Sequence, residues 1–124
     1  MKKRGDKMPY INLEISKKIE STQKEELKDR LAEILLQEGN KPEEYFMFSL
    51  SENREMWFRG KKSEVIYIEL KYVGEFSLIQ KEKITERACN MCSKVTGIMP
   101  ENIYITFQEI AGENWETVEK RLHK

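Results

Sequence analysis

The sequence predicts one domain of the α/β (α+β) class, a duplicated β-α-β unit with a four-stranded mixed sheet and two helices on one face. Three observations predict this fold. Two segments that alternate as strands do, residues 8–15 and 65–70, closely resemble one another. An amphipathic helix pattern that closes with Gly-x-x-Pro follows each segment, and a further strand pattern follows each helix. Crossovers between parallel strands are right-handed, so two such units place both helices on the same face.

In the first unit, the alternation that begins after Pro9 predicts a strand. The apolar face of this strand consists of Ile11, Leu13 and Ile15. Thr22 and Glu25 fit a capping box at the start of a helix. The apolar stripe of this helix consists of Leu27, Leu31, Ile34 and Leu35. Gly39 is expected to end the helix in a left-handed conformation. Residues 45–50 are almost all apolar, which predicts a central strand covered on both faces.

The second unit repeats this order over residues 65–107. Its first strand corresponds to residues 8–15 at an offset of 55, whereas the two Gly-x-x-Pro ends correspond at an offset of 58. Ser77 and Gln80 fit a second capping box, and Gly97 is expected to end the helix. The apolar stripe of this helix consists of Ile84, Ala88, Met91, Cys92 and Val95. Residues 103–107 predict the closing strand.

The pattern does not show which face of the second strand in the first unit is buried. At the offset of 58, Phe46 and Phe48 correspond to Tyr104 and Thr106, so an apolar pair matches a polar one. The segment that follows, residues 51–63, is irregular and rich in aromatic and basic side chains. Met56, Trp57, Phe58 and Arg59 are of types enriched at interface cores, which favours a contact between subunits over packing onto the same domain.

Composition and charge narrow the class of protein. The chain has 124 residues with 22 basic and 22 acidic side chains, so its zero net charge gives no electrostatic basis for binding nucleic acid. No apolar run approaches the roughly 18 residues of a membrane-spanning helix. The basic N-terminus lacks the apolar core of a secretory signal. We therefore expect a cytoplasmic protein without nucleic-acid or membrane partners, while export by a non-classical route stays open.

Three segments are expected along the chain: a leader of residues 1–8 that is disordered or removed, a domain at 9–115, and a charged tail at 116–124. In the tail region, Trp115, Val118 and Leu122 have the spacing of a short amphipathic helix. Cys89 and Cys92 form a C-x-x-C in the middle of a helix pattern, where core packing is favoured over metal or redox chemistry. We expect no metal and no cofactor.

Several short motifs occur in a characteristic order. They are Met8-Pro9 before a strand, Gly39-x-Lys41-Pro42-x-x-Tyr45 after the first helix, Pro100-x-x-Ile103-Tyr104-Ile105 after the second, and Asn114-Trp115. On the duplicated frame, this order resembles the macrophage migration inhibitory factor (MIF) branch of the tautomerase superfamily. The resemblance implies a homotrimer that interconverts keto and enol forms of small α-keto acids such as phenylpyruvate without a cofactor. It also implies that the base is an amino-terminal proline exposed when the initiator methionine is removed.

The resemblance assigns roles to particular residues. Pro9 is the expected general base, Lys41 the group that holds the substrate carboxylate, and Val73 a donor through its backbone N–H. Tyr104 is expected to line the pocket from the neighbouring subunit. Thr106 is included as a substrate-binding position because it stands where the family has an asparagine, which puts the hydrogen bond there in question.

This sequence departs from the family at the expected base, because eight residues precede Pro9. A free proline amine can act as a base, whereas the nitrogen of an internal proline is an amide without a basic lone pair. Two interpretations follow. The chain is a tautomerase if Pro9 becomes its first residue, or a catalytically silent MIF-like trimer with a binding or signalling role if the leader stays attached.

Overall fold

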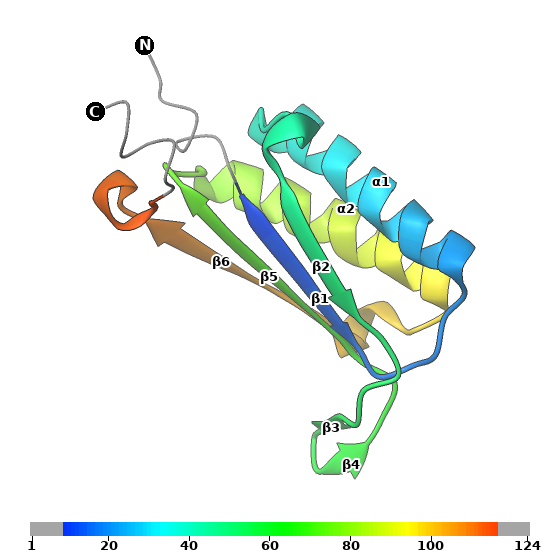
Figure 1. Ribbon diagram of the computed structural model, residues 1–124. Coiled ribbons are helices and arrows are strands. Elements are labelled where there is room, and N and C mark those ends of the chain that lie inside the picture. Colours follow the sequence, from blue (N-terminus) through cyan, green and yellow to red (C-terminus); the bar gives the residue numbers. More distant parts are fainter. Residues whose placement is uncertain (1–8, 117–124) are drawn as a thin grey trace.

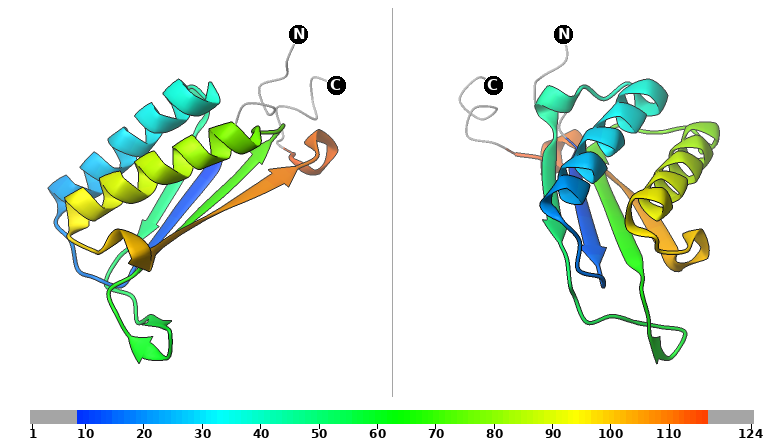
Figure 2. Two further views of the ribbon diagram at one scale, coloured as in Figure 1. Left: turned by 180° about the vertical axis from the view of Figure 1, so that it is seen from behind. Right: turned by 90° about the vertical axis from the view of Figure 1, so that its right-hand side faces the viewer.

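A four-stranded sheet carries both helices on one face, as the computed structural model shows for residues 9–116, the part of the chain that it describes (Figure 1). The strands of this sheet are β1 (Tyr10–Ile15), β2 (Met47–Ser51), β5 (Ile66–Val73) and β6 (Ile103–Ile110). The helices are α1 (Ser21–Gly39) and α2 (Leu78–Thr96), which lie side by side on one side of the sheet (Figure 2). The expected leader, Val118 and Leu122 lie outside the described residues.

The strand order is β2-β1-β5-β6, with β1 parallel to β2, β5 parallel to β6, and β1 antiparallel to β5. The predicted mixed sheet of two β-α-β units is therefore confirmed. The parallel pairs join Ile11 to Phe48 and Ile66 to Ile103, a separation of 37 residues in both units. The offset of 55 residues thus applies to the second strands as well, and the offset of 58 holds only for the helix ends.

This register assigns the faces of β2. Phe48 and Leu50 pair with Ile11 and Leu13 and pack with them against the core, while Met47 is 59% exposed on the other face. β2 is an edge strand, so the predicted central strand covered on both faces is wrong. The apolar run was misleading because two of its residues do not belong to the buried face of the strand. Tyr45 lies in the 3-10 turn η2 (Glu43–Tyr45), and Met47 is exposed.

The core lies between the sheet and the two helices. The predicted apolar faces of β1 and β5 are buried there, as are the stripes of α1 and α2, except that Val95 is only partly buried. α2 begins as predicted, because the Ser77 hydroxyl accepts from the Gln80 amide at 3.1 Å and Gln80 Oε1 accepts from the Ser77 amide at 2.8 Å. The Thr22–Glu25 box is wrong. α1 begins at Ser21, where Gln23 Oε1 accepts from the Glu20 amide at 2.7 Å.

The two helices end differently. Gly97 ends α2 with a φ of 81°, as predicted. In α1, however, Asn40 takes the left-handed conformation with a φ of 56°, and Gly39 is the last helical residue. Glycine is needed at position 39 for another reason: a Cβ there would lie 2.8 Å from Cε1 of the Phe76 ring. The absence of a side chain at Gly39 lets that ring approach the end of α1.

Between β2 and β5 the chain forms a small hairpin of β3 (Trp57–Phe58) and β4 (Lys61–Lys62), which projects beyond one end of the sheet (Figure 1). Its turn uses two left-handed residues, Arg59 with a φ of 55° and Gly60 with a φ of 80°. The segment expected to be irregular therefore contains a short ordered hairpin.

Candidate functional site

Pro9 lies at the end of the sheet where β1 begins and β5 ends (Figure 1). It is buried, and its carbonyl accepts a hydrogen bond from the Met47 amide at 3.0 Å. β1 pairs with β5 so that Tyr10 faces Lys71, and the same antiparallel register places Pro9 beside Tyr72. The start of β1 is thus held by strands on both sides.

Lys41 reaches the same end of the sheet from the loop that follows α1. Its main chain is fixed by a hydrogen bond from its amide to the Leu35 carbonyl at 3.1 Å. Its ammonium donates to the Val73 carbonyl at 3.2 Å. Three of the predicted site residues, Pro9, Lys41 and Val73, therefore gather at one end of the sheet. Although we expected Val73 to act through its N–H, its carbonyl is the group that contacts Lys41.

Two aromatic rings lie against the Lys41 ammonium. Its Nζ is 5.9 Å from the centroid of the Tyr72 ring and 5.7 Å from that of Phe76. The two rings pack together with centroids 4.4 Å apart, and both are buried, with 1% and 6% of their surface exposed. A cation within about 6 Å of a ring face is attracted by its quadrupole. The two rings therefore form an aromatic surface against which the ammonium lies.

Glu109 of β6 is hydrogen-bonded to both of these aromatic residues. Its carboxylate accepts from the Tyr72 hydroxyl and from the Phe76 amide, each at 3.3 Å, and pairs with Lys81 at 3.3 Å. The Phe76 amide and Lys81 lower the pKa of Glu109, while burial raises the pKa of Tyr72 above its usual value. Sequence reasoning missed this cluster. The signal was Tyr72 on the buried side of β5, since a buried tyrosine hydroxyl needs a partner.

Tyr104 and Thr106 lie elsewhere. In the β5–β6 register, Tyr104 pairs with Tyr67 and Thr106 with Glu69, whereas Val73 pairs with Ile110. Six residues of strand separate the levels of Tyr104 and Val73, which is about 20 Å at a rise of roughly 3.3 Å per residue. A single chain therefore does not bring Tyr104 into contact with Lys41. Thr106 Oγ1 instead lies 3.0 Å from the Tyr67 hydroxyl.

The hairpin lies next to Tyr104. The Phe58 ring meets the Tyr104 ring edge-on, with centroids 5.4 Å apart, and the Arg59 guanidinium lies 4.9 Å from the centre of the Phe58 ring. Trp57 is 63% exposed and Tyr104 is 56% exposed. These aromatic side chains form an exposed surface at the opposite end of the sheet from Lys41.

Cys89 and Cys92 lie in the middle of α2. Burial raises the pKa of the Cys92 thiol to about 12 and also raises that of Cys89, which disfavours the thiolate that redox or metal chemistry needs. Within residues 9–116, no group of three or more acidic, cysteine or histidine side chains is arranged to hold a metal ion. In the same part of the chain, no helix has the length and apolarity to cross a membrane.

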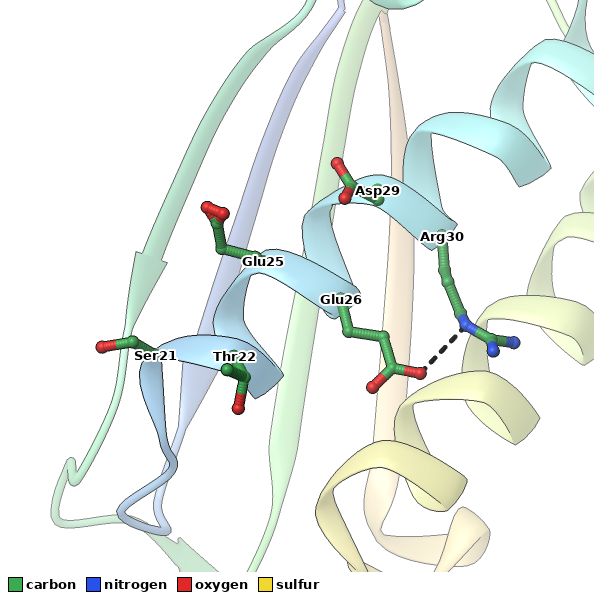
Figure 3. A pocket seen from close by; sticks show the side chains of 6 residues that line it. All are labelled: Ser21, Thr22, Glu25, Glu26, Asp29 and Arg30. Carbon is green, nitrogen blue, oxygen red and sulfur yellow. Dashed lines mark ion pairs between the residues drawn. The ribbon is translucent and has the colours of Figure 1, made fainter.

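A shallow depression on the outer surface of α1 is lined by Ser21, Thr22, Glu25, Glu26, Asp29 and Arg30 (Figure 3). All the side chains that line it come from one helix. An ion pair joins two of them, Glu26 and Arg30, at 3.1 Å (Figure 3). It lies on the first half of α1, which is at the opposite end of the domain from Pro9 (Figure 1). It therefore does not extend the cluster around Lys41.

Comparison with known proteins supports the fold described above. Residues 8–118 match the family model described as macrophage migration inhibitory factor. The chain is 26% identical to the MIF-like protein of Entamoeba histolytica, over 88% of this chain and 94% of that one, with a TM-score of 0.79. For the MIF homologue of Prochlorococcus marinus the identity is 27%, over 87% and 94% of the two chains, with a TM-score of 0.79. No curated protein sequence matches the chain.

Proposed function

Because this chain belongs to the macrophage migration inhibitory factor family, we propose that it is a cofactor-free keto–enol tautomerase acting on small α-keto acids such as phenylpyruvate. Pro9 is the general base once the residues before it have been removed. The single observation that supports this most is the cluster of Pro9, Lys41 and Val73 at one end of the sheet. The cluster combines a buried proline with a cation that suits a carboxylate.

The reaction needs a base and a means of holding an anion. A free Pro9 amine takes a proton from the carbon beside the substrate carbonyl, which leaves an enolate and a protonated amine. Pro9 then returns that proton to the enolate oxygen, which gives the enol and restores the free amine. The reverse steps return the keto form. Burial and a nearby cation both disfavour the protonated amine, so this environment suits a base that works near neutral pH. Lys41 holds the substrate carboxylate as a point charge.

The complete site is proposed to lie between copies of the chain in a homotrimer. Tyr104 and Thr106 are about 20 Å and 13 Å along the strands from the level of Val73. They can therefore contribute to a Lys41 site only from a neighbouring copy. Light scattering is expected to give three subunit masses, and a single subunit mass would contradict the shared site.

The decisive experiment compares two forms of the protein that differ only before Pro9. We expect ketonisation of phenylpyruvate enol by the chain that begins at Pro9, and a rate lower by about 10²–10⁴ when residues 1–8 are retained, the range that a general base contributes. Pro9→Ala in the trimmed chain is expected to lose most of the rate. Equal rates in all three would remove Pro9 from the mechanism.

Lys41 has a matched control in Lys18, an exposed lysine near the opposite end of the sheet. Lys41→Ala is expected to raise the KM for phenylpyruvate, because the carboxylate loses its partner. Lys18→Ala is expected to leave it unchanged. A similar KM in both variants would remove Lys41 from substrate binding.

A second function rests on the chemistry of the sequence itself, in which Met8 acylates the nitrogen of Pro9. If that bond persists in the native protein, the same cluster binds anions without turning them over, as a catalytically silent binding or signalling trimer would. Intact-mass analysis of the native protein separates the two functions. A mass that begins at Pro9 supports the enzyme, and retention of residues 1–8 supports the binding protein.

A further inference from the structure

We propose that Tyr72 and Phe76 are positioning residues for Lys41: their paired rings hold its ammonium at the end of the sheet and thereby set how tightly the site binds a carboxylate. This inference rests on the proposed function and deepens it. Tyr72 lies in β5 and Phe76 in the loop before α2, so neither belongs to the loop that carries Lys41.

The first step of the argument is that Lys41 has a defined position. Its Nζ is 3.2 Å from the Val73 carbonyl and lies within 6 Å of both ring centroids. A lysine side chain is long and flexible, and holding it in one conformation costs entropy. Three contacts from one short stretch of chain, residues 72–76, offset that cost before any substrate arrives.

The second step is that the rings themselves cannot move easily. They pack on each other at 4.4 Å, and Phe107 meets Phe76 edge-on at 6.2 Å. Gly39 lies so close to Phe76 that a Cβ there would overlap the ring. The ring pair is thus confined on several sides.

The third step concerns the carboxylate of Glu109, which holds both members of the pair. It accepts from the Tyr72 hydroxyl and from the Phe76 backbone. Its negative charge is balanced by Lys81 at 3.3 Å, which belongs to α2. Glu109 therefore supports the ring pair from the side of β6.

The main chain before Lys41 is held independently of the rings. Gln80 donates to the Glu38 carbonyl at 3.1 Å, and Arg87 pairs with the Glu38 carboxylate at 2.9 Å. Truncating a ring therefore releases the Lys41 side chain while the end of α1 stays fixed to α2. This separation makes the positioning role measurable.

The first experiment observes Lys41 directly in the full-length chain, so its outcome does not depend on activity. The lysines are ¹³C-dimethylated, which keeps their positive charge, and the Lys41 signal is the one lost in Lys41→Arg. Ring currents are expected to shift this signal upfield of an exposed lysine. Tyr72→Leu and Phe76→Leu are each expected to move it back toward the exposed value, while Tyr72→Phe keeps most of the shift. A signal unchanged by both leucine variants would overturn the proposal.

The second experiment measures binding of phenylpyruvate and of its methyl ester by calorimetry. Tyr72→Leu is expected to weaken binding of the acid about two- to fivefold, the range of a cation–π contact at an accessible site. Binding of the ester should stay the same, because it has no carboxylate for Lys41. Phe48→Leu, which removes a half-buried ring from the same layer, is the matched control and should change neither.

The two proposals fail in different ways. Equal weakening of acid and ester would assign Tyr72 a general packing role and overturn the positioning role. If the Lys41 shift is as expected but the chain that begins at Pro9 neither binds nor turns over phenylpyruvate, the proposed function falls and the placement of Lys41 by the rings stands.

Discussion

Gly39→Ala tests whether the close approach of the Phe76 ring, rather than a left-handed turn, is the reason for glycine at the end of α1. The added Cβ would lie 2.8 Å from Cε1 and 3.0 Å from Cζ of that ring, about 1 Å closer than a normal carbon contact. Overpacking of this kind costs about 1–3 kcal/mol. The better helix propensity of alanine returns at most about 1 kcal/mol. We therefore expect a net loss of roughly 1–2 kcal/mol.

The assay is urea unfolding followed by circular dichroism, with a thermal scan in which Tm should fall by roughly 4–8 °C. The control is the same substitution in a Phe76→Leu background, where the overlapping ring atoms are gone. There, Gly39→Ala is expected to be neutral or stabilising, since only the helix propensity remains. A wild-type background that tolerates Gly39→Ala, or an equal loss in both backgrounds, would refute the steric explanation.

Three further predictions concern the caps and the Glu109 cluster. Ser77→Ala is expected to destabilise the protein by about 1 kcal/mol in urea unfolding, because α2 loses its cap acceptor, while Ser77→Asp keeps most of the stability; equal losses would contradict the capping role. Asn40→Gly is expected to be neutral or stabilising and Asn40→Ala to cost about 1 kcal/mol, because only the alanine is strained at a φ of 56°; the reverse order would contradict the left-handed assignment. The pKa of Glu109 is lowered in the folded state by the Phe76 amide and Lys81, so its contribution is present above the unfolded pKa and is lost as pH falls through the folded pKa. The stability gap between wild type and Glu109→Gln should therefore shrink below about pH 4, and a gap that stays constant from pH 7 to pH 3 would contradict this.

Much of the fold could be predicted because its signals are local. Strand alternation and helical stripes are properties of short segments, and Ser77–Gln80 and Gly97 are residue types that favour their cap positions. Glu20 escaped prediction because glutamate is a weak signal for a helix start. The edge position of β2 escaped it because strand order depends on how the units pair, which no single segment reveals.

The residues of the candidate site also differ in whether the sequence could predict them. Pro9 and Lys41 could be proposed from their place in a motif order, and the structure brings them to one end of the sheet together with Val73. Tyr72, Phe76 and Glu109 could not, because their contacts join β5, the loop before α2 and β6. The roles of Tyr104 and Thr106 stay predictions, since they concern a neighbouring copy of the chain.

The strand order has a consequence for how a terminal base can be precise. Chain ends usually fray, since they lack neighbours to hold them. β1 instead has β2 on one side and β5 on the other, and the Pro9 carbonyl is already bonded to Met47. An amine released at Pro9 would therefore lie at a strand end that is already held on both sides. Under the proposed function, proteolysis or an alternative start site would supply the base without any further folding of the domain.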